Sequence, residues 1–279
     1  MTPAFVVRES RDKTALAQFF SANPPLYAYL LGDLDPFFFD NSRWWTAQRD
    51  SVSSGSIEAT LLSYNAFSTP VMIGLAETDA QAFLWRQTLK TPPAQAHVHF
   101  RKCHTETLAA AGKLERFGTH YKMLWRRDKQ HSDTATLDIS KVATLAPEDI
   151  QSVRDLHQSA SPGAYFDERL LKTGLCFGIW LTDAAVATDT AETLVAFAGC
   201  HVYSKQYSVA ALGAIATHPD YRRQGFGVSV TSRLLGALQD HIDCITLNVH
   251  SNNAPALRIY ERLGFVVECE YEEALLSTD

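Results

Sequence analysis

The second half of the sequence alternates short apolar segments with segments of helical periodicity, and this alternation limits the folds that the chain can adopt. The apolar segments have the length of buried strands, and the others repeat apolar residues every three or four positions. The predicted strands are 176–181, 194–202, 209–217, 244–249 and 265–271, and the predicted helices are 228–242 and 253–263. Strands that alternate with helices predict an α/β layer architecture.

Proline, asparagine and glycine mark the ends of the predicted helices. Pro147 precedes Glu148 and Asp149, and this order suits a first helical turn because acidic groups interact favourably with the positive end of the helix dipole. Asn253 is a candidate N-cap, and Gly264 is a candidate stop.

A polar segment without periodicity, 128–136, is the best candidate for a linker. It follows the apolar stretch 121–125 and divides the chain into 1–130 and 137–279. At about 150 residues per domain, a chain of 279 residues suits two domains of this kind.

Charge and cysteine usage exclude several classes of protein. The chain has 25 Lys and Arg against 31 Asp and Glu, so we expect no nucleic-acid partner. It has no apolar run long enough to span a membrane, and its start does not resemble a secretory signal. Five scattered cysteines without a CxxC pair argue against disulfides and cysteine zinc sites, and they favour a reducing, cytoplasmic location.

Two further groups of residues have structural rather than chemical interpretations. His97 and His99 would lie on one face of a strand, but no third ligand is identifiable nearby, so we expect no metal site. The aromatic residues at 37–39 and 44–45 indicate core or inter-domain packing, with the lining of a substrate pocket as the alternative. The sequence contains no Walker loop, HExxH, EF-hand or GxSxG motif.

Residues 214–227 show the pattern that points to chemistry. A strand ends at Thr217, Pro219 sets the turn, and two arginines and two glycines precede a helix. Glycines let backbone N–H groups approach a ligand, the helix adds its positive end, and arginines add charged donors. The segment predicts a pyrophosphate site of neither the Walker nor the Rossmann type. The alternative is an ordinary strand–turn–helix with solvated arginines.

A second segment, 247–265, contains a strand followed by an asparagine-capped helix with a tyrosine and a Gly-Phe ending. The R-x-x-G-x-G loop (222–227), Asn253 seven residues before Tyr260, and the Tyr-Glu-Arg-Leu-Gly-Phe ending together resemble the GNAT acetyltransferase superfamily over 137–279. The resemblance implies a mixed sheet flanked by helices. It also implies acetyl-CoA as acyl donor and a primary amine of a small molecule, amino acid or peptide as acceptor.

The resemblance also implies a set of binding residues, with the pantetheine along the edge of strand 209–217. These residues are Ile215, Ala216, Thr217, Arg222, Arg223, Gln224, Gly225, Phe226, Gly227, Val228, Asn253 and Tyr260. A backbone N–H near Ile215 would stabilise the oxyanion, and Asn253 would hold the pantetheine or its water. The leaving thiolate belongs to a thiol with a pKa of about 8.5, and Tyr260, a phenol with a pKa of about 10, would hydrogen-bond and protonate it. The alternative for Tyr260 is a packing residue.

The general base is not identified by the resemblance. Many family members have a carboxylate on the strand that here spans 209–215, but this segment contains neither Asp nor Glu. His201, Tyr203 and His250 are candidates for accepting the amine proton, directly or through water. Alternatively, the amine arrives neutral and needs no base.

The first half shows a faint repeat of the second. Residues 114–118 repeat the pattern of 260–264, which predicts a tandem duplication with a degenerate GNAT-like domain in 1–130. In this interpretation 114–118 closes a helix and Leu114 replaces the tyrosine. Residues 74–79 would stand in place of the phosphate loop, and their carboxylates would repel a pyrophosphate. Residues 26–34 also resemble two-domain glycine N-acyltransferase-like proteins, in which the first domain helps to wall the acceptor site; the alternative is a plain amphipathic helix.

The sequence therefore predicts a tandem GNAT-like N-acetyltransferase that is active in its second domain. The alternative is a CoA-binding regulatory module without turnover, which the missing strand carboxylate favours and the presence of Asn253 and Tyr260 disfavours. A pure interaction scaffold is disfavoured by the arginine–glycine loop. The acceptor, the acyl chain and the oligomeric state stay open, with a homodimer as one option.

Overall fold

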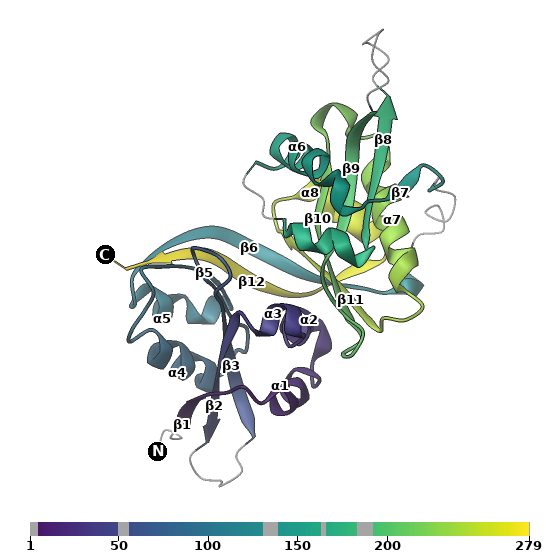
Figure 1. Cartoon of the computed structure of the whole chain (residues 1–279). Helices are drawn as coiled ribbons and strands as arrows, with labels where there is room; N and C mark the ends of the chain where they lie inside the picture. The colour runs from purple at the N-terminus through teal and green to yellow at the C-terminus, as the bar shows by residue number, and fades with distance from the viewer. Residues whose placement is uncertain (1–4, 50–55, 131–138, 163–165, 183–191, 279) are drawn as a thin grey trace. The chain divides into compact units, whose positions relative to one another are not determined.

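The computed structural model describes residues 5–49, 56–130, 139–162, 166–182 and 192–278. The chain forms two compact units (Figure 1). The first comprises the described residues within Met1–Lys122, Val249–Asn252 and Val267–Asp279, and the second those within Met123–Asn248 and Asn253–Val266. The units are therefore not continuous in sequence, because the C-terminal segment belongs to the first unit. Most of the predicted linker 128–136 lies outside the described residues.

The first unit is built on a mixed sheet. Its strands lie in the order β1 (Phe5–Glu9), β2 (Ser42–Arg49), β3 (Ile57–Tyr64), β4 (Val71–Gly74), β5 (Gln95–Phe100), β12 (Phe265–Ser277) and β6 (Lys113–Trp125). β4 and β5 are parallel, whereas β5 and β12 are antiparallel. The helices are α1 (Lys13–Phe20), α2 (Pro24–Gly32), α3 (Pro36–Phe39), α4 (Asp79–Thr88), α5 (Thr105–Ala109) and the short 3-10 helix η1 (Lys102–His104).

Local sequence explains why these elements form where they do. Asp12, Asn23 and Thr78 each accept a backbone N–H in the first turn of α1, α2 and α4. On β5, Val98 and its alternate neighbours are buried in a core with the side chains of α4, while His97 and His99 face the other way. The predicted common face of the two histidines is confirmed.

In the second unit, the strands lie in the order β11 (Cys244–His250), β10 (Val209–Thr217), β9 (Glu192–Ser204), β8 (Cys176–Thr182) and β7 (Val142–Thr144). β10 and β11 are parallel, and the other neighbours are antiparallel. The α-helices are α6 (Ile150–Ala160), α7 (Phe226–Leu238) and α8 (Ala254–Arg262). The 3-10 helices are η2 (Arg127–Lys129), η4 (Pro147–Asp149), η5 (Glu168–Thr173) and η6 (Pro219–Tyr221). The predicted mixed α/β architecture is confirmed.

Most predicted boundaries lie within two residues of those in the structure, and two differ by more. α7 begins at Phe226 and ends at Leu238, four residues before the predicted end, where the polar sequence after Leu238 leaves the helix. β12 continues to Ser277 because its alternating residues pair with β5, from Glu272 opposite Phe100 to Ser277 opposite Gln95. This long-range partner lengthens the strand beyond its local apolar pattern.

The order of elements repeats along the chain, which supports the tandem architecture. After the first strand and its helices, both halves continue strand–strand–strand–helix–strand–helix–strand. The predicted position of 114–118 is wrong: these residues lie within β6, and the preceding helix α5 already ends at Ala109. Leu114 therefore does not take the place of Tyr260 in α8. A five-residue similarity did not distinguish a helix end from a strand, because the partners that decide it are distant in sequence.

The C-terminal strand completes the hydrogen bonding of the first unit. Glu272 on β12 is 1% exposed, and it accepts hydrogen bonds from Arg116 and from Thr119 Oγ1, the latter at 2.7 Å. Burial would raise the pKa of Glu272, but these partners outweigh it and lower the pKa. The pair ties the last strand of the chain to β6 within this unit.

A second buried polar group lies on α2 and the neighbouring strands. Asp33 is buried at the end of α2, and Lys122 on β6 is buried with its ammonium group 4.5 Å from the ring centroid of Tyr29. Burial raises the pKa of Asp33 to about 8, although Lys122 acts in the opposite direction.

We expect Asp33 to make folding stability fall as the pH rises. The unfolded carboxyl has a pKa of about 3.9, so the folded state binds the proton more tightly between roughly pH 4 and 8. The substitution Asp33→Asn removes this titration, and thermal unfolding followed from pH 5 to 8 should show a smaller fall in Tm than in the parent chain. The exposed Asp40→Asn is the control; equal slopes in all three proteins would contradict the assignment.

Candidate functional site

The pairing of β10 with β11 stops halfway along β10. The two strands pair over four residues only, from Val209 opposite Cys244 to Leu212 opposite Leu247. Beyond Leu212, β10 stays paired with β9 on its other side, up to Thr217 opposite Ala196. Residues 213–217 therefore have one edge without a β11 partner, and such an edge presents backbone donors and acceptors to a ligand.

A β-bulge lies within this half-open part of β10. Gly213 pairs with Gly199 and Ala216 with Phe197, so Ala214 and Ile215 face the single residue between them on β9. Ala214 has a φ of 54°, in the left-handed region that costs a non-glycine residue about 1 kcal/mol or more. The strained residue immediately precedes Ile215, whose backbone N–H is the predicted oxyanion donor.

Arg222 fastens the R-x-x-G-x-G loop to two neighbouring elements. Its Nε donates to the carbonyl of Thr217 at 3.3 Å, and its Nη2 donates to the carbonyl of Ala160 at the end of α6, at 3.1 Å. Arg223 is exposed with a φ of 66°, and among the described residues its side chain has no hydrogen bond or ion pair. Arg222 thus has a structural role, whereas the guanidinium of Arg223 is available to a ligand.

Glycines bring the start of α7 close to the end of β10. Gly225 has a φ of 87° and precedes the first helical residue, Phe226. A Cβ on Gly227 would lie 3.2 Å from Thr217 Oγ1, so a larger side chain there would separate helix and strand. Gln224 is exposed beside them, and Val228 is buried in the helix–sheet core. The backbone N–H groups of the first turn of α7 are therefore presented beside the open edge of β10.

The predicted tyrosine and asparagine both belong to α8. Asn253 Oδ1 accepts the N–H of Ala256 at 3.2 Å, so the predicted N-cap is confirmed. Tyr260 is 8% exposed, and its ring meets that of Phe265 edge-on at 5.9 Å between centroids. Burial raises the pKa of Tyr260, which keeps its hydroxyl protonated at neutral pH.

The three candidate bases have different environments. His250 accepts the N–H of Asn252 at Nδ1 (3.0 Å), so Nε2 holds the proton and donates to the carbonyl of Phe117, also at 3.0 Å. Both of its nitrogens are engaged within the first unit. Tyr203 lies opposite Ala210, four residues before the bulge residue Ala214. His201 is half-buried on β9, next to the open half of β10.

Two residues of this region are missed by sequence reasoning. The carbonyl of Ala160 holds Arg222, but a backbone acceptor leaves no trace in residue type. Asp167 is 6% exposed and binds Arg169, with Asp167 Oδ1 2.9 Å from Arg169 Nε. A single buried aspartate in a 3-10 segment has no periodic pattern, although its spacing of two residues from an arginine is visible in the sequence.

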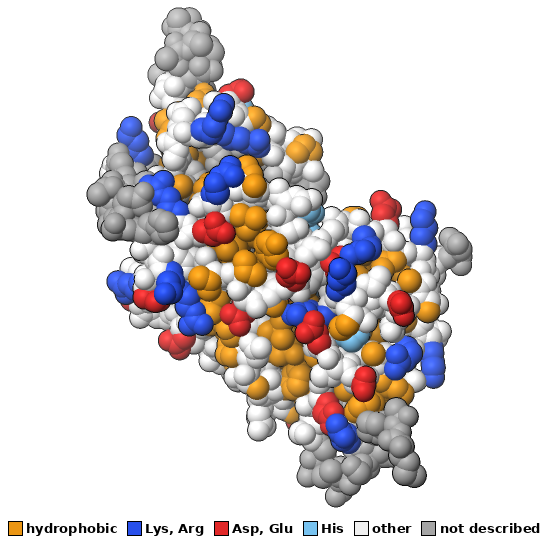
Figure 2. All heavy atoms as spheres, turned by 180° about the vertical axis from the view of Figure 1, so that it is seen from behind, with side chains coloured by type: hydrophobic (Ala, Val, Ile, Leu, Met, Phe, Trp, Pro, Cys, Tyr) orange, Lys and Arg blue, Asp and Glu red, His pale blue; other side chains and the backbone are white. Residues whose placement is uncertain are grey.

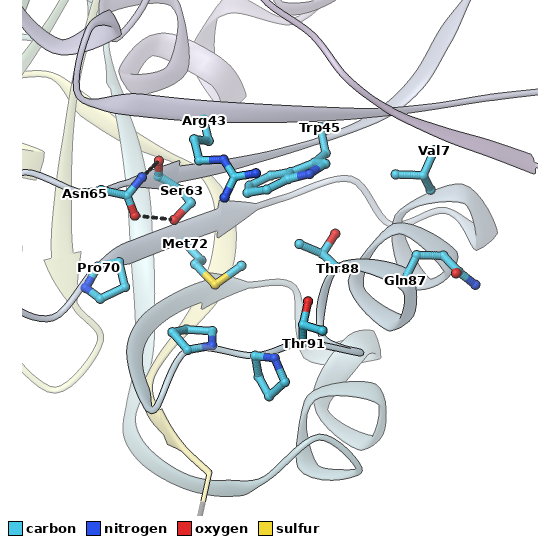
Figure 3. Close-up of a pocket in the computed structure, with 12 residues that line it drawn as sticks. Val7, Arg43, Trp45, Ser63, Asn65, Pro70, Met72, Gln87, Thr88 and Thr91 are labelled. Atoms are coloured by element: carbon cyan, nitrogen blue, oxygen red, sulfur yellow. Dashed lines mark hydrogen bonds between the residues drawn. The ribbon is translucent and has the colours of Figure 1, made fainter.

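A separate pocket of about 400 Å³ lies in the first unit and contains none of the predicted site residues (Figure 3). Arg43 covers the ring of Trp45 at 4.8 Å and binds Glu9 at 2.8 Å. Ser63 and Asn65 hydrogen-bond each other at 3.0 Å. These polar groups therefore already have partners, and we assign the pocket no chemistry.

The remaining predictions concern packing, metals, membranes and nucleic acid. Trp44 is fully buried and stacks on Phe39 in the first unit, whereas Phe37 is 39% exposed. Among the described residues, no three His, Cys, Asp or Glu side chains are grouped to hold a metal ion. None of the helices described here is long and apolar enough to cross a membrane. On the face seen in Figure 2, basic and acidic side chains are interspersed.

We expect Gly225→Ala to destabilise the chain through the backbone alone. No atom lies within 4 Å of the added Cβ, but the positive φ costs alanine about 1 kcal/mol. Gly236→Ala in the same helix is the matched control, since its Cβ also meets open space and helix propensity favours alanine by about 0.5–1 kcal/mol. The urea concentration at the midpoint of unfolding should fall in Gly225→Ala and rise in Gly236→Ala. A shift of both midpoints in the same direction would disprove the strained conformation at Gly225.

Comparison with known proteins agrees with this geometry. Three solved structures share the fold over nearly the whole chain. A Drosophila protein has a TM-score of 0.68 at 12% identity, covering 98% of this chain and 99% of its own. A GCN5-related N-acetyltransferase from Sphaerobacter thermophilus has a TM-score of 0.60 at 15% identity, and the match covers 97% of this chain and 95% of that protein. A tandem GNAT protein from the clavulanic acid biosynthesis pathway has a TM-score of 0.55 at 12% identity, and the match covers 98% of this chain and 97% of that protein.

Two findings concern the family itself. The [ribosomal protein bS18]-alanine N-acetyltransferase of Escherichia coli strain K12 is 40% identical over 57 residues, which cover 20% of this chain and 38% of that enzyme. Residues 148–265 match the family described as "Acetyltransferase (GNAT) family". The segment that is similar to GNAT acetyltransferases, residues 148–265, makes up less than half of this chain.

Proposed function

We propose that the chain is an N-acetyltransferase that transfers an acetyl group from acetyl-CoA to a primary amine of a small molecule, amino acid or peptide. The observation that supports this most directly is the half-open edge of β10 beside the R-x-x-G-x-G loop and the start of α7. The match of residues 148–265 to the GNAT family supports the donor, since that family implies acetyl-CoA as cosubstrate.

The residues of the loop and of the open edge of β10 suit acetyl-CoA both in their chemistry and in their placement. Arg223, Gly225 and Gly227 would hold the pyrophosphate, because a free guanidinium, a left-handed turn and a closely approached helix start all favour an anion. Residues 215–217, on the edge without a β11 partner, would hydrogen-bond the amide-containing pantetheine. When bound, acetyl-CoA supplies the reactive thioester.

The chain's own groups then have distinct chemical roles. The backbone N–H of Ile215 would donate to the carbonyl oxygen on which negative charge develops. Tyr260 would donate its hydroxyl proton to the departing sulfur. Its raised pKa keeps the phenol protonated over the pH range in which amines become neutral, so the hydroxyl would be present to donate as negative charge develops on the sulfur.

The acceptor is an amine whose identity is open. The relatives from Escherichia coli are named for alanine of a ribosomal protein, and the match spans 38% of their length. A peptide with an N-terminal alanine is therefore the first acceptor to test, followed by amino acids and small amines. The cytoplasmic location and the homodimer stay predictions.

We expect Arg223→Glu to weaken acetyl-CoA binding about 10- to 100-fold, the value of a lost charge-assisted hydrogen bond. Arg223 is a better target than Arg222, whose hydrogen bonds to Thr217 and Ala160 also maintain the loop. Lys205→Glu, exposed in the turn at the opposite end of β10, is the control for net charge. Calorimetric titration with acetyl-CoA and with CoA measures the affinity of both variants and of the parent chain. If the parent chain binds neither, the acetyltransferase proposal is wrong.

We expect Tyr260→Phe to lower kcat about 100-fold while acetyl-CoA affinity stays within error, because only the proton donor is removed. Steady-state rates with an acetylated amine, combined with the same titration, separate the two effects. An unchanged kcat would assign Tyr260 to packing against Phe265. A parent chain that binds acetyl-CoA and acetylates no amine would support the regulatory module instead.

A further inference from the structure

The open half of β10 contains no group able to accept a proton from an amine. Its residues from Val209 to Thr217 are Val, Ala, Ala, Leu, Gly, Ala, Ile, Ala and Thr. A side chain that acts as base would therefore come from an element other than β10. β9 runs along this half of β10 and pairs with it up to Thr217.

The imidazole of His201 lies over the backbone of Gly213. A Cβ built on Gly213 would be 2.8 Å from His201 Cβ, 3.2 Å from its Cγ and 3.3 Å from its Nδ1. The histidine thus takes up the space that a side chain at position 213 would occupy. Gly213 is the residue immediately before the bulge at Ala214 and Ile215, so His201 contacts the strand two residues before the proposed oxyanion donor.

A second bulge, on β9 itself, accounts for this placement. Ala211 pairs with Val202 and Leu212 with Cys200, which leaves His201 as the extra residue between them. Bulges redirect a side chain out of the regular alternation of a strand. The absence of a side chain at Gly213 and the bulge at His201 are two independent features that produce one contact.

A buried carboxylate lies at the start of η5, whose Leu170 and Leu171 pack in one core with Phe197 of β9, the strand that carries His201. Asp167 is 6% exposed and is held by Arg169 through Nε at 2.9 Å and through the backbone N–H at 3.0 Å. Burial would raise the pKa of Asp167, but Arg169 outweighs it, and His201 lowers the pKa further. Asp167 is therefore ionised at neutral pH and stabilises positive charge on His201.

Burial shifts the pKa values of other titratable groups on the surrounding elements. Burial lowers the pKa of His157 on α6, which keeps its imidazole neutral. Burial raises the pKa of Cys176 on β8 to about 12 and also raises that of Cys200 on β9. β10 adds no titratable side chain. Among the described groups with a shifted pKa, Asp167 is the one whose pKa His201 lowers.

We propose that His201 is the general base of the acetyl transfer and that Asp167 is its positioning residue; this inference rests on the proposed function. The amine nitrogen forms a bond with the thioester carbon, and its proton passes to a ring nitrogen of His201. The carbon–sulfur bond breaks, and the sulfur takes the proton of Tyr260. The imidazolium of His201 and the phenolate of Tyr260 then exchange the proton through solvent, so that amide and free CoA thiol are the products.

The test is the pH dependence of the rate in His201→Gln, with the N-terminal-alanine peptide and a panel of primary amines as acceptors. We expect kcat to fall about 100-fold and the acidic limb of the kcat/KM profile to be lost, because the group that titrates on that limb is gone. Acetyl-CoA affinity, measured by titration, should be unchanged, which also verifies folding. His241→Gln, exposed after α7, is the matched histidine control.

Two further variants test whether the placement of the His201 imidazole matters, in addition to its presence. Asp167→Asn should move the acidic limb to lower pH, since loss of the carboxylate lowers the pKa of the imidazole. Gly213→Ala should lower kcat by displacing His201, and it should cause no further loss in the His201→Gln background. If the acidic limb of the kcat/KM profile lies at the same pH in Asp167→Asn as in the parent chain, Asp167 does not position His201.

The outcomes separate this inference from the function on which it rests. Turnover in His201→Gln with the parent's kcat and pH profile would overturn His201 as base and leave the acetyltransferase proposal standing. A parent chain that binds acetyl-CoA but acetylates no amine would overturn the proposed function and this inference together.

Discussion

The functional part of this chain depends on the point at which β10 and β11 stop pairing. Their parallel ladder ends at Leu212 and Leu247, and the rest of β10 keeps only β9 as a partner. The lost pairing and the strained φ of Ala214 both cost stability. Packing offsets that cost, since Phe197 and Ala216 are buried together in the core beneath α6. The result is a rigid strand with one edge free for a ligand, which a fully paired sheet could not offer.

Small residues allow the other parts of the site to approach that edge. Gly227 brings α7 to Thr217, Gly213 admits His201, and Gly225 turns the chain into the helix. Arg222 fastens the loop by bonding the carbonyls of Thr217 and Ala160. In the first unit, the loop between β4 and α4 instead contains Glu77, paired with Arg101 at 2.8 Å. The two halves thus share an order of elements while their loops present opposite charges, so the charge that suits a pyrophosphate is found in the second unit.

Local sequence determined much of the second unit. The limits of β10, β11 and α8 follow from apolar runs and from the cap Asn253, because each is set by neighbours within a few residues. The same holds for the R-x-x-G-x-G loop, whose glycines and arginines indicate an anion site by residue type alone. Family resemblance could be inferred for the same reason. Tandem architecture was also predicted, although the five-residue repeat offered for it lies in β6 and not at a helix end.

Only the tertiary structure decided which residues meet across the sequence. The pairing of β12 with β5 extends that strand and assigns it to the first unit, and no local pattern contains this information. The candidate bases were equivalent in sequence, yet Phe117, more than a hundred residues away, engages His250, while Gly213 makes room for His201. Residue type and short-range periodicity thus determined the elements and the anion site. The proton acceptor and the strand partners depended on tertiary structure, because hydrogen bonds and close contacts join segments whose separation the sequence does not encode locally.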